Sequence, residues 1–123
     1  MKHYNKLIGN YGEFVSREFL IKQGYKIMDT NFKCKLGEID IISFVSSKNC
    51  ICFTEVKSRY NTFYGRPCES ITYKKILRLK NIAQYYILKN NLHKFNFRFD
   101  VIEILFHIEN DTYDINLIEN AFN

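Results

Sequence analysis

Two stretches of mostly apolar and β-branched residues flank a short polar segment in the first half of the chain. The stretches cover residues 39–45 and 50–56, and the polar segment covers residues 46–49. This pattern is typical of a β-hairpin, although the turn lacks the Asn-Gly or Asp-Gly pair that would mark it strongly. We therefore expect two neighbouring antiparallel strands here.

Helices and further strands are expected on both sides of this hairpin. Apolar residues recur at steps of three and four in residues 6–23, and again from residue 70 or 72 to about residue 89, which predicts two helices. Gly24 is a plausible stop signal for the first helix. Other apolar stretches predict strands at residues 25–32, 97–106 and 113–117. Because a helix separates the strands, we expect part of the sheet to be parallel and covered by helices.

Composition and charge are compatible with a single domain that spans residues 1–123. A chain of 123 residues with 46% hydrophobic and 25% charged residues can bury a hydrophobic core. The N-terminal residues show no apolar run typical of a signal peptide, and no stretch is long enough to span a membrane, so a cytoplasmic location is the default expectation. The net charge of +5 favours an anionic partner, nucleic acid first, although a basic surface without a partner remains an alternative.

The four cysteines are expected to be reduced thiols, because the chain shows no secretory signal. Cys50 and Cys52 lie two residues apart on one predicted strand, which is not the C-x-x-C spacing of a zinc knuckle. Free cysteine commonly packs as a small hydrophobic residue, so burial is favoured over a zinc site.

Each strand of the predicted hairpin carries an acidic residue. If the turn is symmetric about its centre, Asp40 lies opposite Glu55. The same register places Glu38 opposite Lys57. Directly opposed side chains have Cβ atoms only about 4.5–5.5 Å apart, where like charges destabilise a sheet. A divalent cation held between the carboxylates of Asp40 and Glu55 would remove this repulsion.

This acid pair has the chemistry of a metal site that acts on phosphates. Mg²⁺ takes oxygen ligands and usually needs only one or two protein carboxylates besides water and substrate phosphate; the backbone carbonyl of Val56 would be a further ligand. Lys57 lies two residues after Glu55, hence on the same face, where it would assist a metal-activated water or stabilise charge on the phosphate. The alternative is a structural set of ion pairs, Glu38 with Lys57 and another cation near Asp40 and Glu55.

Basic residues follow the acid pair and gather on the second predicted helix. Lys74 and Arg78 lie opposite the apolar stripe, with Lys75 at its flank, and no acidic residue interrupts the row. A solvated polar face is one explanation, but such faces usually mix charges, so contact with a phosphate backbone is slightly favoured. Arg59 and Arg66 would extend this surface, although packing against the core is the favoured alternative for Arg66.

Several short motifs occur together along the chain. Residues 37–40 read Gly-Glu-Ile-Asp, and residues 53–59 read Phe-Thr-Glu-Val-Lys-Ser-Arg. The other motif residues are Gly12-Glu13, Gly24-Tyr25, Asn31, Gly65, Pro67, Lys74, Arg98-Phe99-Asp100-Val101 and Asn120-Ala121-Phe122. In this combination the chain resembles, over nearly its whole length, the YraN-type bacterial family, which is grouped with the PD-(D/E)XK nuclease fold near the archaeal Holliday-junction resolvases. Its departures, Lys33 and Cys68, lie outside the acid cluster.

The resemblance implies an α/β fold with a restriction-endonuclease-like core, a mixed β-sheet flanked by helices in the order α-β-β-β-α-β-β. It makes Asp40 the motif aspartate and places Glu55 and Lys57 in the Glu-x-Lys motif. Glu13 lies four residues before Arg17, and from this spacing alone an exposed ion pair is favoured. The resemblance reverses that preference, because Glu13 matches a first-helix glutamate that joins the metal site in resolvase-like members.

Together these observations lead us to expect a Mg²⁺- or Mn²⁺-dependent DNA endonuclease that hydrolyses phosphodiester bonds. By resemblance only, the substrate would be branched or single-stranded DNA, and a homodimer would suit the two symmetric cuts of a four-way junction. The alternative is a nucleic-acid-binding or partner-binding module of a DNA-processing assembly, without chemistry of its own. The net charge and the basic helix would suit such a module, but it has no need of opposed carboxylates. A structural protein without a nucleic-acid partner is the third possibility.

Overall fold

The secondary-structure elements follow one another in the expected order. The computed structural model describes residues 2–60 and 71–122, except for the side chains of residues 2–9 and 108. The elements within these residues are α1 (Lys2–Lys22), β1 (Lys26–Cys34), β2 (Gly37–Val45), a 3₁₀ turn (Ser46–Lys48), β3 (Cys50–Tyr60), α2 (Tyr73–Lys89), β4 (Asn96–His107), a second 3₁₀ turn (Ile108–Asn110) and β5 (Thr112–Ile118). The order α-β-β-β-α-β-β is confirmed, and the predicted boundaries differ from the observed ones by a few residues.

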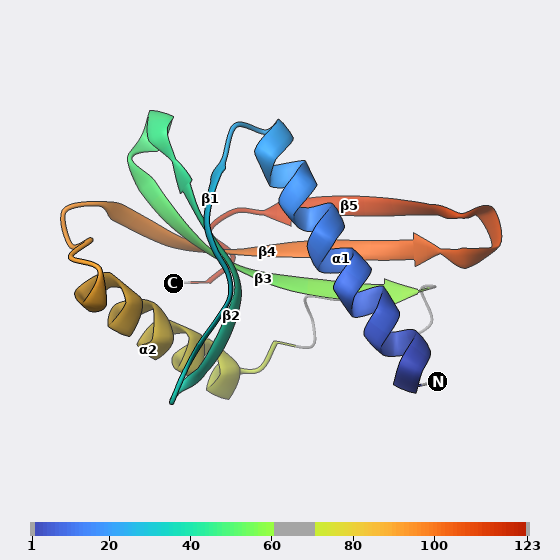
Figure 1. Cartoon of the computed structure of the whole chain (residues 1–123), viewed down its shortest axis with the longest axis horizontal. Coiled ribbons are helices and arrows are strands. Elements are labelled where there is room, and N and C mark those ends of the chain that lie inside the picture. Colours follow the sequence, from blue (N-terminus) through green and yellow to red (C-terminus); the bar gives the residue numbers. More distant parts are fainter. Residues whose placement is uncertain (1, 61–70, 123) are drawn as a thin grey trace.

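The strands form one mixed sheet of five strands in the order β1-β2-β3-β4-β5 (Figure 1). β3 and β4 are parallel, whereas the other neighbouring strands are antiparallel. α2 connects the two parallel strands, because such a pair cannot be joined by a short turn. This is the helix-flanked mixed sheet expected of a restriction-endonuclease-like core. In the described part of the chain, no helix is long and apolar enough to cross a membrane.

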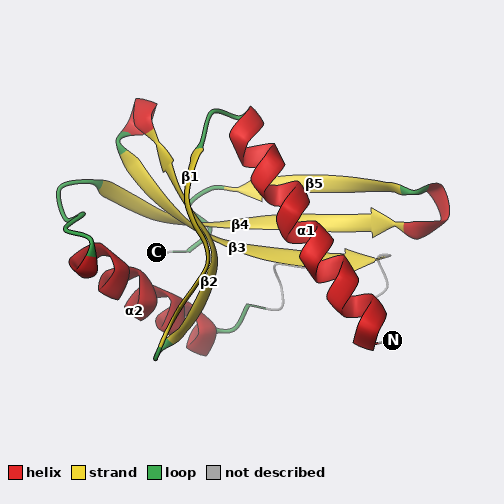
Figure 2. Cartoon of the chain, viewed as in Figure 1, coloured by secondary structure: helices red, strands yellow, loops and turns green. Residues whose placement is uncertain are grey.

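The helices cover opposite faces of the sheet, so there is a hydrophobic core on each side (Figure 2). The core under α2 contains Ile39, Ile42, Ile51, Phe53, Leu79, Ile82, Ala83, Tyr86, Ile87 and Phe99. The core under α1 contains Val15, Leu20, Ile41, Ile102, Ile104 and Phe106. Each helix is therefore held against the sheet mainly by burial of its own apolar stripe.

Local signals in the sequence set the ends of the helices next to the sheet. Gly24 ends α1 with a φ of 92°, which glycine adopts at little cost, and the N–H of Tyr25 donates to the carbonyl of Leu20 across this turn. Thr72 begins α2, because its side chain accepts a hydrogen bond of 3.1 Å from the backbone N–H of Lys75. The first turn of α2 is thereby placed beside β3.

β1 and β2 are interrupted at the same level, at Asn31 and Asp40. The register pairs the residues on either side of these two but not the two themselves. Asn31 has a φ of 50°, in the left-handed region that Asn tolerates better than most residues. On β2 the alternation of faces also changes here, because Ile39 packs under α2 and Ile41 packs under α1. Asp40 therefore lies where the ladder between β1 and β2 is interrupted, within the continuous strand β2.

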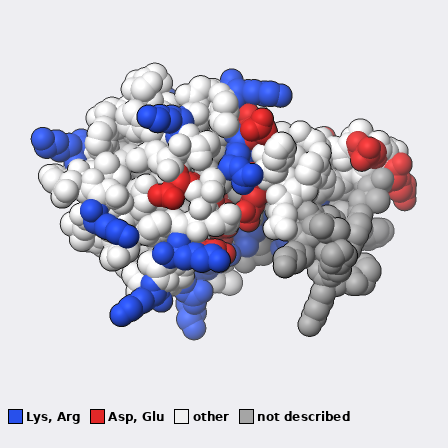
Figure 3. Space-filling model, in the orientation of Figure 1, with Lys and Arg blue, Asp and Glu red and all other residues white. Residues whose placement is uncertain are grey.

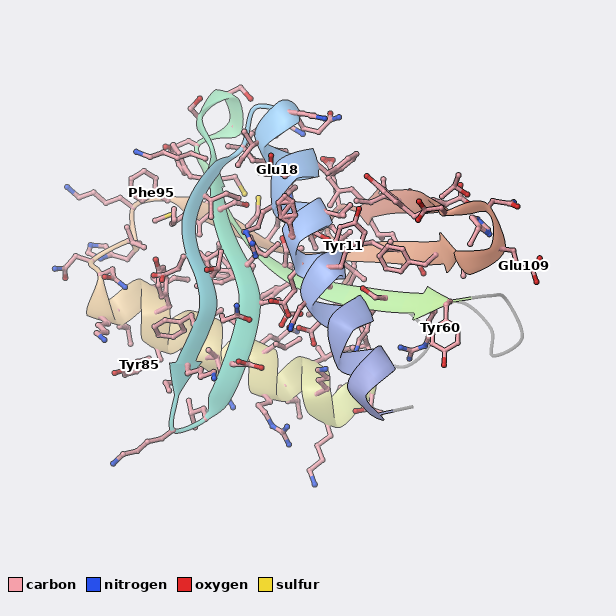
Figure 4. The ribbon with its side chains drawn as sticks, turned by 45° about the vertical axis from the view of Figure 1, so that its right-hand side comes forward. Tyr11, Glu18, Tyr60, Tyr85, Phe95 and Glu109 are labelled. Atoms are coloured by element: carbon pink, nitrogen blue, oxygen red, sulfur yellow. The ribbon has the colours of Figure 1, made fainter. Side chains whose placement is uncertain are left out.

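α1 approaches β3 closely at Gly12. A Cβ atom built on this buried glycine would overlap the side chain of Ser58 on β3, so a residue without a side chain allows this contact. In Figure 4, α1 passes over β3, and Tyr60 marks the end of the strand beyond the helix. The close contact at Gly12 brings the next residue, Glu13, to the cavity beside β3.

Candidate active site between two diverging strands

The predicted acid pair lies where β2 and β3 separate. The predicted register is confirmed over the paired part of the hairpin, which ends with Ile41 opposite Thr54. The next residues are Asp40 and Glu55, and beyond them the two strands diverge (Figure 1). The acids therefore follow the last backbone pair of the ladder instead of forming a further pair, and a cavity opens between the strands at this point.

The expected opposition of Glu38 and Lys57 is wrong. Because β2 separates from β3 after the last pair, Glu38 has its partner on β1, where it lies opposite Lys33. Lys57 lies opposite Glu103 of β4 instead. Glu38 and Lys57 nevertheless line the same cavity, so both remain beside the acid pair.

Asp40 is held in the gap between the strands by the backbone of β3. Its Oδ2 accepts a hydrogen bond of 2.8 Å from the N–H of Val56. Burial has the largest effect on the pKa of Asp40, followed by a hydrogen bond to the carboxyl of Glu55 and by the charge of Glu55. Together they raise the pKa of Asp40 to about 8, and the hydrogen bond from Val56 lowers it by a smaller amount. The two carboxyl groups are thus close neighbours in the gap between the strands.

Glu55 is buried and carries an ion pair with a residue of the second helix. Lys75 Nζ lies 2.6 Å from Glu55 Oε2. Burial lowers the pKa of Lys75, but the hydrogen bond and charge of Glu55 outweigh it, so the net shift is upward. The pKa of Lys57 is lowered by burial and then by the neighbouring ammonium of Lys75. The ammonium groups of Lys57 and Lys75 therefore both lie near Glu55, and Lys75 is the one that forms the ion pair with it.

Most of the predicted site residues described by the structure line a single cavity of about 660 Å³. Its lining includes Glu13 from α1, Glu38 and Asp40 from β2, Glu55, Val56, Lys57 and Arg59 from β3, and Lys75 and Arg78 from α2. The charges come from both sides of the sheet, because the gap between the diverging strands is open to α1 as well as α2. Lys74 is exposed and does not line the cavity, and Arg66 and Cys68 lie outside the described residues.

Glu13 lines this cavity and lies near Asp40. Its charge contributes to the raised pKa of Asp40. Arg17, the expected ion-pair partner, lies with its guanidinium 6.0 Å from the centre of the Phe14 ring. The position of Glu13 therefore agrees with the role that the family resemblance implies rather than with the spacing argument.

The donor groups suit a hard cation, although they are not assembled as a closed set of ligands. Among the described residues, no three His, Cys, Asp or Glu side chains are grouped as a metal-ligand cluster. Asp40 and Glu55 supply two adjacent carboxyl groups, which is the number that Mg²⁺ commonly takes from a protein. These residues fit Mg²⁺ or Mn²⁺, and an ion that binds Oε2 of Glu55 takes the place of the Lys75 ammonium.

Basic side chains surround the cavity on the side of α2. Figure 3 shows Lys and Arg gathered along the lower edge of the molecule, where α2 and the turn between β1 and β2 lie. Lys74 and Arg78 are both exposed on α2, as the sequence predicts. Arg59 extends from β3 into the same cavity. A polyanion that reached the acid pair would pass these cations.

A second buried acid, Asp100 on β4, is fully enclosed and lies outside the cavity. Arg98 Nε donates to its carboxylate at 2.9 Å, and the backbone N–H of Asn120 donates to the same oxygen at 2.9 Å. Arg98 also donates to the hydroxyl of Tyr25 at 2.6 Å and forms an ion pair of 3.3 Å with Glu119. This cluster joins β4, the start of β1 and the C-terminal segment.

The cysteines of the described residues are free thiols. Cys50 and Cys52 are buried in β3, as the sequence predicts, and Cys34 on β1 is partly buried. Burial raises the pKa of the Cys52 thiol, so this group stays protonated and unreactive. Nothing in their surroundings connects them with the cavity.

The sequence allows for a cation near Asp40 and Glu55 as the structural alternative, but it does not identify this cation as Lys75. Lys75 was expected to contact DNA from the flank of the helix, but its ammonium points at an acid of the neighbouring strand. A signal was present in the sequence: Lys75 is the third residue after Thr72, where a helix start commonly has Glu or Gln. A cation in that position suggests an anionic partner outside the helix.

Comparison with known proteins places the chain in a family. Residues 12–104 match the family described as "Uncharacterised protein family UPF0102". A UPF0102 protein of Clostridium novyi is 54% identical over 122 residues, which cover 99% of this chain and 100% of that protein. UPF0102 proteins of Clostridium tetani and Clostridium acetobutylicum are 52% and 48% identical, over 99% of this chain and 98% of their own lengths. The chain therefore belongs to the UPF0102 family.

Proposed function

We propose that the protein is a divalent-metal-dependent nuclease that hydrolyses phosphodiester bonds in DNA. The observation that carries this proposal is the meeting of Asp40, Glu55 and Lys57 in one cavity, at the break between two strands. Two adjacent carboxyl groups are costly in a sheet unless a cation binds them. The resemblance to PD-(D/E)XK nucleases assigns the same three residues independently of the geometry.

The residues divide into a metal-binding set and a substrate-binding set. Asp40 and Glu55 would hold Mg²⁺ or Mn²⁺, with Glu13 and the carbonyl of Val56 as further ligands. When bound, the metal would polarise a phosphodiester oxygen and lower the pKa of a bound water. Lys57, half-buried beside the acids, would orient the attacking water or neutralise charge that develops on the phosphate.

The basic residues of the rim would bind the DNA backbone. Arg59 and Arg78 line the cavity and can contact phosphates next to the scissile one, and Lys74 lies further out on α2. Branched or single-stranded DNA is the proposed substrate class, by resemblance to the resolvase-related families. A homodimer would present two such sites to a symmetric junction.

The deciding experiment compares cleavage by the wild type with that by Asp40→Asn and Glu55→Gln. Four-way junction, single-stranded and duplex DNA are each incubated with Mg²⁺, Mn²⁺ or a chelator. We expect each substitution to slow cleavage by at least about a hundredfold, as is typical when a group that stabilises the transition state is removed. Glu18→Gln, an exposed acid on α1 away from the cavity, is the matched control and should cleave like the wild type. Cleavage that survives both substitutions, or no cleavage by the wild type on any substrate, contradicts the proposal.

A non-catalytic DNA-binding module is the second candidate, and one observation favours it. The ion pair between Lys75 and Glu55 satisfies an acid of the site without any metal. Such a module would bind DNA with strong salt dependence and without regard to Mg²⁺. The double variant Lys74→Ala, Arg78→Ala would then abolish binding, whereas Asp40→Asn would change neither binding nor any other measured property of the complex.

A further inference from the structure

We propose that Lys75 is a displaceable internal cation. Its ammonium pairs with Glu55 when no divalent ion is bound, and it moves to a DNA phosphate when a divalent ion binds to the acid pair. The inference rests on the proposed function and deepens it. It starts from the 2.6 Å contact between Lys75 Nζ and Glu55 Oε2. The side chain of Glu55 is 6% exposed and that of Lys75 is 36% exposed. The acid is therefore fixed in the protein, while its partner keeps a route to solvent.

The position of Lys75 on α2 is unfavourable within the helix itself. It lies in the first turn, next to Lys74, and this turn contains no acidic residue. A helix N-terminus carries a partial positive charge, so cationic side chains there are destabilising. The acid on β3 offsets this cost, so Lys75 is held by Glu55 and not by its own helix.

A divalent ion and Lys75 cannot both use the same carboxylate oxygen of Glu55. The ion would bring two positive charges next to the ammonium, and the repulsion in a partly buried site would be strong. Lys75 has a long flexible stem, and the cavity beside it has a volume of about 660 Å³, so the side chain has room to move aside. An ion that takes Oε2, the oxygen that Lys75 contacts, therefore requires the ion pair to break.

Arg78 indicates where the displaced ammonium goes. It lies three residues after Lys75, on the same side of α2, and it lines the same cavity. A DNA phosphate bound by Arg78 would accept Lys75 as a second donor once Glu55 is released. Metal and DNA would then bind cooperatively, because a phosphate stabilises the state in which the acid pair is free for the metal.

The test measures Mn²⁺ affinity by isothermal titration calorimetry at pH 8, without DNA. The proteins are the wild type, Lys75→Met, Lys75→Gln and, as the matched control, Lys74→Met on the same helical turn. We expect Lys75→Met and Lys75→Gln to bind Mn²⁺ at least about tenfold more tightly, because the ion no longer has to break a charge-assisted hydrogen bond. Lys74→Met should bind like the wild type. Folding of each variant is checked by circular dichroism.

The outcomes separate this inference from the proposed function. Equal or weaker Mn²⁺ binding by the Lys75 variants, with clear binding by the wild type, overturns the inference and leaves the metal-dependent function standing. Absence of Mn²⁺ binding by every protein overturns both. If the Lys75 variants do not fold, NMR of the lysine ammonium groups in the wild type decides: we expect the Lys75 signal to shift on addition of Mg²⁺ while the Lys74 signal stays. An unchanged Lys75 signal at saturating Mg²⁺ overturns the inference.

Discussion

Among the carboxylates that the described residues bury, Asp100 and the pair of Asp40 and Glu55 differ in how their charges are satisfied. Asp100 is enclosed by Arg98 and the backbone N–H of Asn120, and nothing beyond the chain is needed to pair it. Asp40 and Glu55 lie against each other at the wall of a cavity. Burial alone therefore does not mark a functional acid. The informative difference is that Asp100 is paired in an enclosed site, whereas the acid pair faces a cavity and its one bound cation is partly exposed.

The completeness of the Asp100 site suits a structural role. Arg98 binds Asp100 on one side and Tyr25 and Glu119 on the other, so three separate segments of the chain meet at one guanidinium. The planar fork of arginine suits such a multiple contact. At the acid pair, by contrast, the one cation directly bound to Glu55 among the described residues is Lys75, a flexible side chain that keeps access to solvent.

The largest effect on stability is expected from Asp100→Ala, which removes the buried acid that pairs with Arg98. Removal of the acid leaves the guanidinium of Arg98 buried without its main partner, and we expect the free energy of unfolding to fall by about 3–5 kcal/mol. Urea denaturation followed by circular dichroism measures this loss. Asp114→Ala, which removes an exposed acid paired with His107, is the control and should cost less than about 1 kcal/mol. If Asp100→Ala lowered the free energy of unfolding by less than about 1 kcal/mol, Asp100 would have no structural role that distinguishes it from the acid pair.

The acid pair should show the opposite behaviour, because its charges destabilise the fold. The pKa of Asp40 is raised to about 8, above the value of about 3.9 in an unfolded chain. Between these two values the folded protein binds one proton more than the unfolded protein, so the free energy of unfolding falls as pH rises. This contribution is complete below about pH 4 and is lost as pH rises through about 8. We expect a loss on the order of 1–3 kcal/mol between pH 5 and pH 9 without divalent ions.

Asp40→Asn is the matched variant for this pH profile. The amide can still accept the hydrogen bond from Val56 and can donate to Glu55, as the protonated acid does. We therefore expect the variant to lack this fall in stability and to exceed the wild type at pH 9. Subtraction of the two urea-denaturation profiles removes the contribution of the titratable groups that both proteins share. Parallel profiles for the two proteins would show that the acid pair carries no shared proton.

The smallest effect on stability is expected from Tyr25→Phe, which removes the hydrogen bond between Arg98 and the Tyr25 hydroxyl. The hydroxyl of Tyr25 accepts a hydrogen bond of 2.6 Å from Arg98. Its loss should lower the free energy of unfolding by about 0.5–1.5 kcal/mol, well below the effect of Asp100→Ala. Tyr85→Phe, at an exposed position on α2 that Figure 4 labels, should change stability by less than this and provides the control. An effect as large as that of Asp100→Ala would mean that Tyr25, not the acid, holds the cluster.

The sequence allowed the hairpin and its register to be predicted because both depend on local pattern. Alternation of apolar residues around residues 46–49 fixed which positions pair, and the observed pairing of Ile41 with Thr54 has the predicted symmetry. The same argument failed for Glu38, because nothing in a symmetric hairpin indicates that β2 turns toward β1. β2 stays paired with β1 and separates from β3 at the level where Asn31 and Asp40 interrupt the β1–β2 pairing.

The family resemblance added what local pattern could not supply for Glu13. Spacing along a helix favours an ion pair with Arg17, because both residues lie on one helix. The direction of Glu13 depends instead on the contact of Gly12 with Ser58, which joins segments far apart in the chain. A single sequence does not reveal which helical glycine is a contact with a strand.

The sequence by itself determined the order of the elements, the hairpin register and the three residue types at the centre of the candidate site. These follow from periodicity and from spacing within one strand or one turn. Only the tertiary structure decided which cation holds Glu55, that Asp40 lies in a break between strands, and that Asp100 is enclosed while the acid pair faces a cavity. The physical reason is that each of these depends on how separate segments approach one another, and the energy of a buried charge is set by those distant neighbours.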